Sequence, residues 1–275
     1  MKLTPQCSSV HAHSTFCDGK QPLEEMLEAA YAAGVRYYGA SSHSHTPTGW
    51  DIGETLPVEP AEYRRAVLKQ RELWKGKMEV LLGIELDSTS GELPGEFDYW
   101  IGSVHYLQGA DGRYYPLDWD KPKLTACLNE AFGGDGLAMT EAYYREVAAM
   151  ARRKPTVLGH IDLITKLNGE GEFFDEADPR YRAAALEALH AVDPAATLLE
   201  INTGAMSRKH RTEPYPAPFL LEEWHRMGGR VIITGDVNHK DHMVYAYDQA
   251  AAAARAAGFP EASVLTLEGE KTYML

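Results

Sequence analysis

Residues 78–87 read MEVLLGIELD, a short apolar run that ends on acidic side chains. This length and composition are typical of a buried β-strand. Similar runs recur along the chain, with longer amphipathic segments between them. We therefore predict strands at residues 6–13, 36–43, 78–87, 97–107, 156–163, 196–203 and 230–236, with 263–267 as an eighth strand or only an edge.

The segments between these runs carry helical patterns. The first of them follows Pro22 and stops at Gly34, a proline start and a glycine end. Helices are predicted at residues 23–33, 61–75, 139–153, 179–192, 217–227 and 243–257. Alternating strands and helices predict an α/β fold with a parallel sheet, and seven such units predict a closed or nearly closed barrel in a single domain, 1–275. Residues 109–136 fit an insertion after the fourth strand.

The composition of the 275 residues is that of a globular protein, with 44% hydrophobic and 24% charged residues. Acidic residues outnumber basic ones 40 to 27, which gives a formal net charge of -13. Such a surface repels phosphate backbones, so the composition argues against nucleic-acid binding. A small anionic substrate remains compatible with this charge, because metal ions or a few arginines can reverse the potential inside one pocket.

The three cysteines, Cys7, Cys17 and Cys127, follow no CxxC spacing and are too few for a disulfide framework. A reducing compartment is therefore the default expectation. The first ten residues lack the apolar stretch of a signal peptide, and no run approaches the ~20 apolar residues that span a bilayer. We expect a soluble cytoplasmic protein that does not bind membranes, with its oligomeric state left open.

Histidines and acidic or amide residues recur where the predicted strands end. A lone histidine is more often structural than a ligand, but here all seven predicted strands end on a histidine or a carboxylate. In barrels these strand ends form the active site, so the pattern indicates a metal site with several ions. The residues are His11, His13, Asp18, His43, His45, Glu85, His105, His160, Asp162, Glu200, Asn202, Asp236 and His239.

Imidazole and carboxylate ligands without a set of thiolates suit zinc, iron or manganese better than calcium or magnesium. The number of candidates exceeds what a single ion uses. Glu85 is the natural bridging carboxylate, which would hold neighbouring ions roughly 3.5–4 Å apart. Such a cluster lowers the pKa of bound water towards ~7 and neutralises charge that grows on a phosphoryl oxygen. The sequence therefore favours a hydrolase.

Taken in order, seven motifs resemble those of the PHP (polymerase and histidinol phosphatase) superfamily. GSVH, GHIDL and EINTG are most similar to its monofunctional histidinol-phosphate phosphatases. The resemblance spans residues 10–239 and implies a distorted (β/α)7 TIM-like barrel with three divalent ions. The motifs are HAHSTFCDG (11–19), GASSHSH (39–45), GIELD (83–87), GSVHY (102–106), GHIDL (159–163), EINTG (200–204) and GDVNH (235–239).

The resemblance also implies three ligand sets and a catalytic role for Glu85, Asp236 and His239. The implied sets are His11, His13, Glu85 and Asp236 for the first ion, Glu85, His105 and His160 for the second, and Asp18, His43 and His239 for the third.

The chain departs from the family pattern twice. The last motif of the family is Asp-x-His, whereas this chain has one additional residue before the histidine. His239 is favoured as its ligand, with His242 as the alternative. Ser42 stands where the family has an acid before the histidine of the second motif. The serine changes a contact to a ligand rather than a ligand itself.

Basic residues cluster in TGAMSRKHRTEP (203–214), directly after the sixth predicted strand. A guanidinium can bind phosphate through two parallel hydrogen bonds, and the resemblance places a phosphate-contacting arginine in this region. We predict that Arg208 and Arg211 bind substrate, with Lys166 and His45 as weaker candidates. The alternative is a solvated charged loop, and for His45 a loop histidine without a function.

The resemblance implies a phosphatase that hydrolyses L-histidinol phosphate to L-histidinol and phosphate in histidine biosynthesis. Three alternatives stay open from the sequence. One is a PHP phosphoesterase that acts on nucleotide or sugar phosphates. Another is an amidohydrolase-type enzyme that cleaves C–N bonds, although no strand-end lysine is present to bridge its metals. The last is a non-catalytic metal-binding regulatory barrel, which degenerate ligands would signal.

Overall fold

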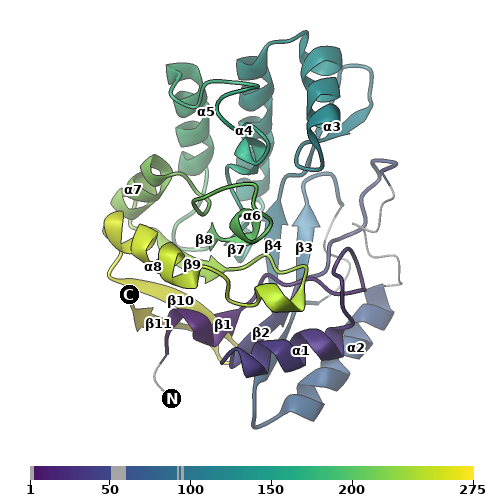
Figure 1. Cartoon of the computed structure of the whole chain (residues 1–275), viewed down its shortest axis with the longest axis vertical. Coiled ribbons are helices and arrows are strands. Elements are labelled where there is room, and N and C mark those ends of the chain that lie inside the picture. The colour runs from purple at the N-terminus through teal and green to yellow at the C-terminus, as the bar shows by residue number, and fades with distance from the viewer. Residues whose placement is uncertain (1–2, 51–59, 92, 94–95) are drawn as a thin grey trace.

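A curled, mostly parallel sheet forms the centre of the computed structural model, which describes residues 3–50, 60–91, 93 and 96–275 (Figure 1). The first seven strands of the sheet pair in parallel, each with the next in the order of the chain. They are β1 (Ser8–Ser9), β2 (Tyr37–Ala40), β3 (Glu79–Asp87), β4 (Tyr99–Ser103), β7 (Val157–Leu158), β8 (Leu198–Asn202) and β9 (Arg230–Thr234).

The sheet closes at the carboxyl ends of its strands. The amide of His13 donates a hydrogen bond to the carbonyl oxygen of Val237 at 2.9 Å. The amide of Val237 donates one to the carbonyl oxygen of His11 at 3.0 Å. These bonds join the segment after β1 to the segment after β9, with Ala12 opposite Val237. The predicted parallel α/β barrel is confirmed, and its first and last strand ends lie together at the closure.

The eighth predicted strand exists and is part of a hairpin. β10 (Glu261–Thr266) pairs in antiparallel fashion with β11 (Gly269–Met274) along its whole length. It meets β9 in parallel only where Ser263 lies opposite Ile232. The hairpin therefore extends the sheet beyond the seven strands that supply the strand-end residues.

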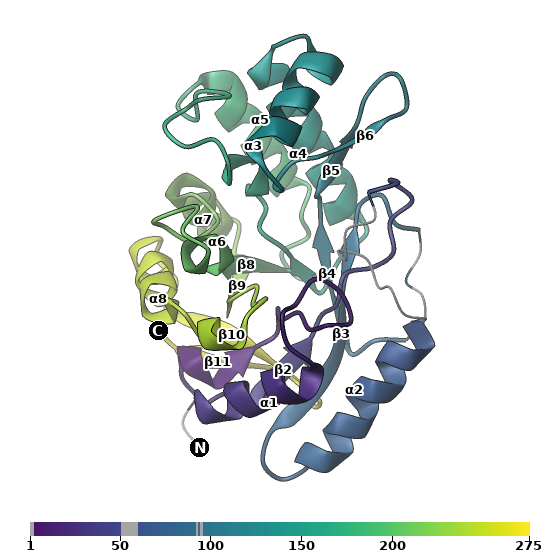
Figure 2. The same cartoon turned by 45° about the vertical axis from the view of Figure 1, so that its right-hand side comes forward.

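Helices cover the outside of the sheet (Figures 1 and 2). α1 shows why they pack there: Leu23, Met26, Leu27 and Ala30 recur at helical spacing and are all buried. The helix begins after Pro22, as predicted. The main helices are α1 (Leu23–Ala32), α2 (Pro60–Trp74), α4 (Gly136–Arg152), α5 (Pro179–His190), α7 (Pro218–Arg226) and α8 (Tyr247–Ala256).

An apolar layer fills the barrel below the strand ends. Its members come from successive strands and from the residue before His11, and every one is buried. Close packing of this layer makes the interior a core rather than a channel. The layer consists of Val10, Leu81, Tyr99, Ile101, Val157, Leu198, Ile232 and Leu265.

Tyr99 shows how glycines permit this packing. A Cβ added at Gly39 would lie 2.1 Å from the Tyr99 hydroxyl oxygen, and one added at Gly83 would lie 2.2 Å from Cζ of the Tyr99 ring. The two glycines thus make room for an aromatic ring against β2 and β3. The Tyr99 hydroxyl donates to the carbonyl oxygen of Val10 at 2.5 Å, which ties the layer to the segment that carries His11.

Several strands are shorter than predicted, because pairing stops where the polar strand ends begin. The predicted strand at 156–163 pairs only over β7, and its end turns into the short helix η3 (Leu163–Thr165). The predicted insertion at 109–136 begins just after β5 (Tyr106–Gln108) and contains its hairpin partner β6 (Tyr114–Pro116), α3 (Lys121–Ala126) and η2 (Cys127–Ala131). None of the helices in the described part of the chain is long and apolar enough to cross a membrane.

Candidate metal centre

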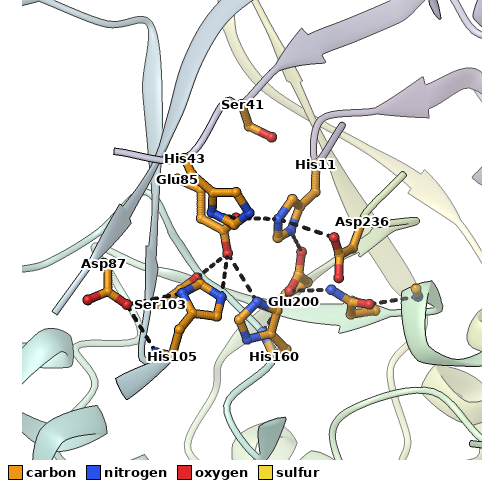
Figure 3. A network of polar contacts seen from close by, with 12 residues as sticks. His11, Ser41, His43, Glu85, Asp87, Ser103, His105, His160, Glu200 and Asp236 are labelled. Atoms are coloured by element: carbon orange, nitrogen blue, oxygen red, sulfur yellow. Dashed lines mark hydrogen bonds and ion pairs between the residues drawn. The ribbon is translucent and has the colours of Figure 1, made fainter. Parts of the chain in front are cut away.

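Seven strand ends bring histidines and carboxylates together at one end of the barrel (Figure 3). His11 and His13 follow β1, and alternate residues of an extended segment project to one side. His43 follows β2 and lies opposite Glu85 of β3 in a parallel bridge. The remaining members are His105 after β4, His160 after β7, Glu200 on β8 and Asp236 after β9.

Glu85 lies at the centre of this cluster and is 1% exposed. Its Oε1 is 3.1 Å from Nε2 of His160 and 3.4 Å from Nε2 of His105. Its Oε2 is 3.2 Å from Nε2 of His11 and 3.0 Å from Nδ1 of His43. Oε2 also lies 3.5 Å from Nε2 of His13. The two carboxylate oxygens therefore face different imidazoles, an arrangement that fits a bridging carboxylate.

Within the described residues, four overlapping sets of side chains could each hold a metal ion, with ligand atoms within 4.8 Å of one another. Several of these atoms are buried without a hydrogen-bond partner, among them Nε2 of His11 and His13, Oδ1 of Asp18 and Oε2 of Glu85. Such unpaired buried atoms are rare in proteins, and divalent ions would satisfy them. The sets are His11, His13 and Asp236; His11, Glu85 and His160; His13, Asp18 and His43; and His43, Glu85 and His105.

Two carboxylates outside the four sets, Glu200 and Asp87, contact the imidazole rings and fix their orientation. Nδ1 of His11 lies 2.5 Å from Oε1 of Glu200, and Oε2 of Glu200 accepts a hydrogen bond from the amide of His160 at 2.7 Å. Asp87 lies 3.0 Å from Nδ1 of His105. Contacts of this kind set the tautomer of a ligating histidine. The role of Asp87 was not predicted; its signal in the sequence is the two-residue step after Glu85.

The charges of the cluster balance one another in the absence of ions. Burial lowers the pKa of His11, but the carboxylates of Glu200, Glu85 and Asp236 outweigh it and raise this pKa from 6.5 to about 10. Burial also opposes ionisation of Glu85, yet the surrounding histidines hold its pKa well below the usual range. Because metals bind neutral imidazole, ions that enter this site must displace protons.

The structure does not bring His239 to this cluster, contrary to the prediction for the third ligand set. His239 precedes η4 (Lys240–His242), and its Nδ1 accepts a hydrogen bond from the amide of Asp241 at 3.2 Å. Its ring lies 5.6 Å from that of His242, which also belongs to none of the four sets. His13 joins Asp18 and His43 instead.

Asn238 occupies the place between Asp236 and the expected histidine. Its Nδ2 donates a hydrogen bond to Oδ2 of Asp18, and its Oδ1 accepts one from Nη1 of Arg208 at 2.7 Å. Along this segment Asp236 and Asn238 face the site, while Val237 between them is fully buried and packs near Met243. The chain is not regularly extended here, because Asp236 has a positive φ of 44°, and His239 after Asn238 faces Asp241 rather than the site.

A pocket of about 250 Å³ opens onto the cluster, and two of the predicted substrate-binding residues line it. Arg208 is one, with Nη2 2.7 Å from Oδ2 of Asp236. Lys166 is the other, with Nζ 2.7 Å from Oδ2 of Asp118. Arg211 instead donates to Thr165 and lines a neighbouring surface pocket.

His45, the fourth predicted substrate-binding residue, is exposed and lies outside the set of residues that line the pocket. Its carbonyl oxygen accepts a hydrogen bond from the Ser90 hydroxyl at 2.7 Å. That contact is structural. Of the predicted substrate-binding residues, Arg208 and Lys166 thus lie beside the candidate metal ligands, and Lys20 lines the same pocket.

Comparison with known proteins gives a consistent result. Residues 9–204 match the family model described as PHP domain. The chain is 30% identical over 260 residues to the "Probable histidinol-phosphatase" of Deinococcus radiodurans, covering 90% of this chain and 92% of the relative. A relative of the same name from Schizosaccharomyces pombe is 24% identical, covering 86% of this chain and 81% of the relative.

A solved structure shares the fold. The histidinol phosphate phosphatase of Lactococcus lactis subsp. lactis, crystallised in complex with zinc, L-histidinol and phosphate, superposes with a TM-score of 0.65 at 18% identity. The alignment covers 97% of this chain and 99% of the other.

Proposed function

The chain belongs to the PHP domain family, and from this premise we propose that it is a metal-dependent phosphatase that hydrolyses L-histidinol phosphate to L-histidinol and phosphate in histidine biosynthesis. One observation carries the proposal: a buried cluster of imidazoles and carboxylates shares its pocket with Arg208 and Lys166. Both curated relatives compared above carry the name of this activity. The proposed compartment is the cytoplasm, where the three free cysteines would stay reduced.

We propose three divalent ions of zinc, manganese or iron. His11, His13 and Asp236 would hold one ion, and His105 and His160 would hold a second with Glu85. The third would lie between Asp18 and His43. The first set is one of the groups in the structure, and the third is the group of His13, Asp18 and His43 with His13 given to the first ion. The second set joins His105 and His160 through Oε1 of Glu85, which faces both imidazoles, and His239 is left out. Glu85 would bridge neighbouring ions, because its two oxygens face different imidazoles.

When bound, such ions lower the pKa of water to supply a nucleophile at neutral pH and neutralise charge on the phosphoryl group. The chain itself binds and orients the substrate. Asp236 and Asn238 hold the guanidinium of Arg208 in one orientation, so that little side-chain freedom is lost when phosphate arrives. Lys166 adds a second cation on the wall of the pocket. Together they would hold the phosphate dianion against the metal cluster.

The test is a panel of phosphomonoesters assayed with protein of known metal content. We expect L-histidinol phosphate to give a higher kcat/KM than nucleotide or sugar phosphates. A chelator should abolish the activity, and zinc, manganese or iron should restore it. Full activity in protein shown by elemental analysis to be metal-free would refute the mechanism, and a clear preference for a nucleotide or sugar phosphate would refute the substrate.

A further inference from the structure

Four carboxylates line the pocket beside the cluster: Asp18, Glu85, Asp118 and Asp236. Three of them belong to the sets that could hold metal ions, and Asp118 is the fourth. It lies between β6 and α3, in the irregular segment that the sequence identified as an insertion. Among the described acids of this pocket, Asp118 alone therefore has no part in the proposed metal centre.

Asp118 forms an ion pair with Lys166 on the pocket wall. Oδ2 of Asp118 lies 2.7 Å from Nζ of Lys166, and the two side chains are 20% and 10% exposed. Burial opposes ionisation of Asp118, but Lys166 outweighs burial and lowers the pKa of this carboxyl. A partly buried pair of opposite charges contributes little net stability, because both groups lose hydration. Its position in the pocket suggests a role in binding.

We propose that Asp118 binds the ammonium group of an aminoalkyl phosphate substrate, while Lys166 is released to the phosphate. This inference rests on the proposed function and names the group that recognises the substrate's tail. In L-histidinol phosphate three bonds of about 1.5 Å each separate the amine nitrogen from the ester oxygen. An ammonium group so close to the phosphate must be bound inside the same pocket.

The ion pair also explains how substrates would be distinguished. A substrate that carries both an ammonium and a phosphate group replaces the Asp118–Lys166 ion pair by two new ion pairs. Asp118 then pairs with the ammonium group and Lys166 with the phosphate. A phosphomonoester without an amine can attract Lys166 only by drawing it out of its 2.7 Å ion pair with Asp118, whose carboxylate then faces a dianion. Leaving a partly buried charge unpaired is costly, so the pair selects against such substrates.

The experiment compares Asp118→Asn with wild type on two substrates, L-histidinol phosphate and its counterpart without the amine. We expect kcat/KM for L-histidinol phosphate to fall roughly 10- to 100-fold, the effect of losing one charge-assisted hydrogen bond. The value for the other substrate should stay within about threefold or rise, because Lys166 becomes free. Metal content by elemental analysis should not change.

Asp120→Asn is the matched control. Asp120 lies two residues further on, caps α3 by accepting a hydrogen bond from the amide of Lys123, and does not line the pocket. Asparagine is an equally good cap, so this variant should behave as wild type. Lys166→Met gives a second test: it should raise KM for both substrates and preserve or increase the preference for the amine.

Direct binding gives a readout that does not depend on turnover. L-histidinol should bind the metal-loaded Asp118→Asn variant about tenfold or more weakly than wild type in calorimetry, while inorganic phosphate binds no more weakly. Equal losses of kcat/KM on both substrates would show that the ion pair is structural. An unchanged kcat/KM for L-histidinol phosphate would show that Asp118 does not bind the amine. Either result overturns the proposal.

Failure of the proposed function can be told apart from failure of this inference. If wild type does not hydrolyse L-histidinol phosphate, the comparison is repeated with ethanolamine phosphate and propyl phosphate. A preference for the amine that Asp118→Asn removes would support the ammonium site even though the proposed function is wrong. No preference for the amine in wild type would overturn the inference itself.

Discussion

Replacing Asn238 by alanine is expected to weaken the binding of one metal ion, the one that Asp18 would hold. The change removes the hydrogen bond from Nδ2 to Oδ2 of Asp18 and leaves Oδ1 of Asp18 3.6 Å from Nδ1 of His13 and 3.7 Å from Nε2 of His43. A hydrogen bond to a charged group is worth about 1.5–3 kcal/mol. The Asp18 side chain is 27% exposed, so the lower end applies after solvent screening. About 1.4 kcal/mol corresponds to a tenfold loss of affinity.

The assay is stepwise removal of metal with increasing chelator, with elemental analysis at each step. The Asn238→Ala protein should lose one ion per chain at roughly tenfold lower chelator concentration than wild type, while the other ions are retained equally well. His239→Ala is the matched control, because this neighbour is 38% exposed and faces Asp241. Wild-type retention in Asn238→Ala together with loss of an ion in His239→Ala would refute the reasoning and assign the last ligand to His239.

Three further outcomes are expected. Glu85→Gln should lower kcat at least ~100-fold, because it removes the charge shared by neighbouring ions; activity within threefold of wild type would show that Glu85 is not a bridge. Arg208→Ala should raise KM for the phosphomonoester several-fold to ~100-fold, and Arg208→Lys should rescue it partly because the charge remains and the planar fork is lost. A rise in KM confined to Arg211→Ala would show that Arg211, and not Arg208, binds the phosphate. Burial lowers the pKa of His11, but the carboxylates around it outweigh burial and raise this pKa from 6.5 to about 10. Protonated His11 therefore contributes fully to the stability of the metal-free protein below pH 6.5, and this contribution is lost as the pH rises through about 10. The melting temperature of metal-free protein should therefore fall across this window, and metal uptake at pH 7 should release protons into weak buffer; uptake without proton release would contradict the raised pKa.

The architecture and most of the ligand cluster could be predicted because they depend on short-range patterns. Apolar runs that close on His11, Glu85 or His160 mark strand ends, and parallel strands bring their carboxyl ends to one face. No distance is needed for that inference. The glycines of β2 and β3, by contrast, had no visible role until Tyr99 was placed against them.

The third ligand set could not be predicted, for a physical reason. The chain leaves the extended conformation at Asp236, which has a positive φ of 44°, and the sequence alone does not show this change of direction or which of the following side chains then faces the site. The family motif Asp-x-His favours His239 as the ligand, whereas in the structure Asn238 contacts Asp18 and Arg208. Asp118 was missed for a different reason: it lies in an irregular segment without periodicity, and its partner Lys166 is 48 residues away.

Arg208 connects the candidate metal ligands with the part of the pocket that would bind phosphate. Its guanidinium contacts both the carbonyl and the carboxylate of Asp236, and through Asn238 it is connected to Asp18. These hydrogen bonds tie the orientation of Arg208 directly to one metal-ligand candidate and, through the Asn238 amide, to another. The cation that would receive the phosphate is therefore oriented by the same carboxylates that would bind the ions. The hydrogen bonds from Arg208 to Asp236 and Asn238 are already present in the structure, so the guanidinium is oriented toward the pocket before a substrate would arrive.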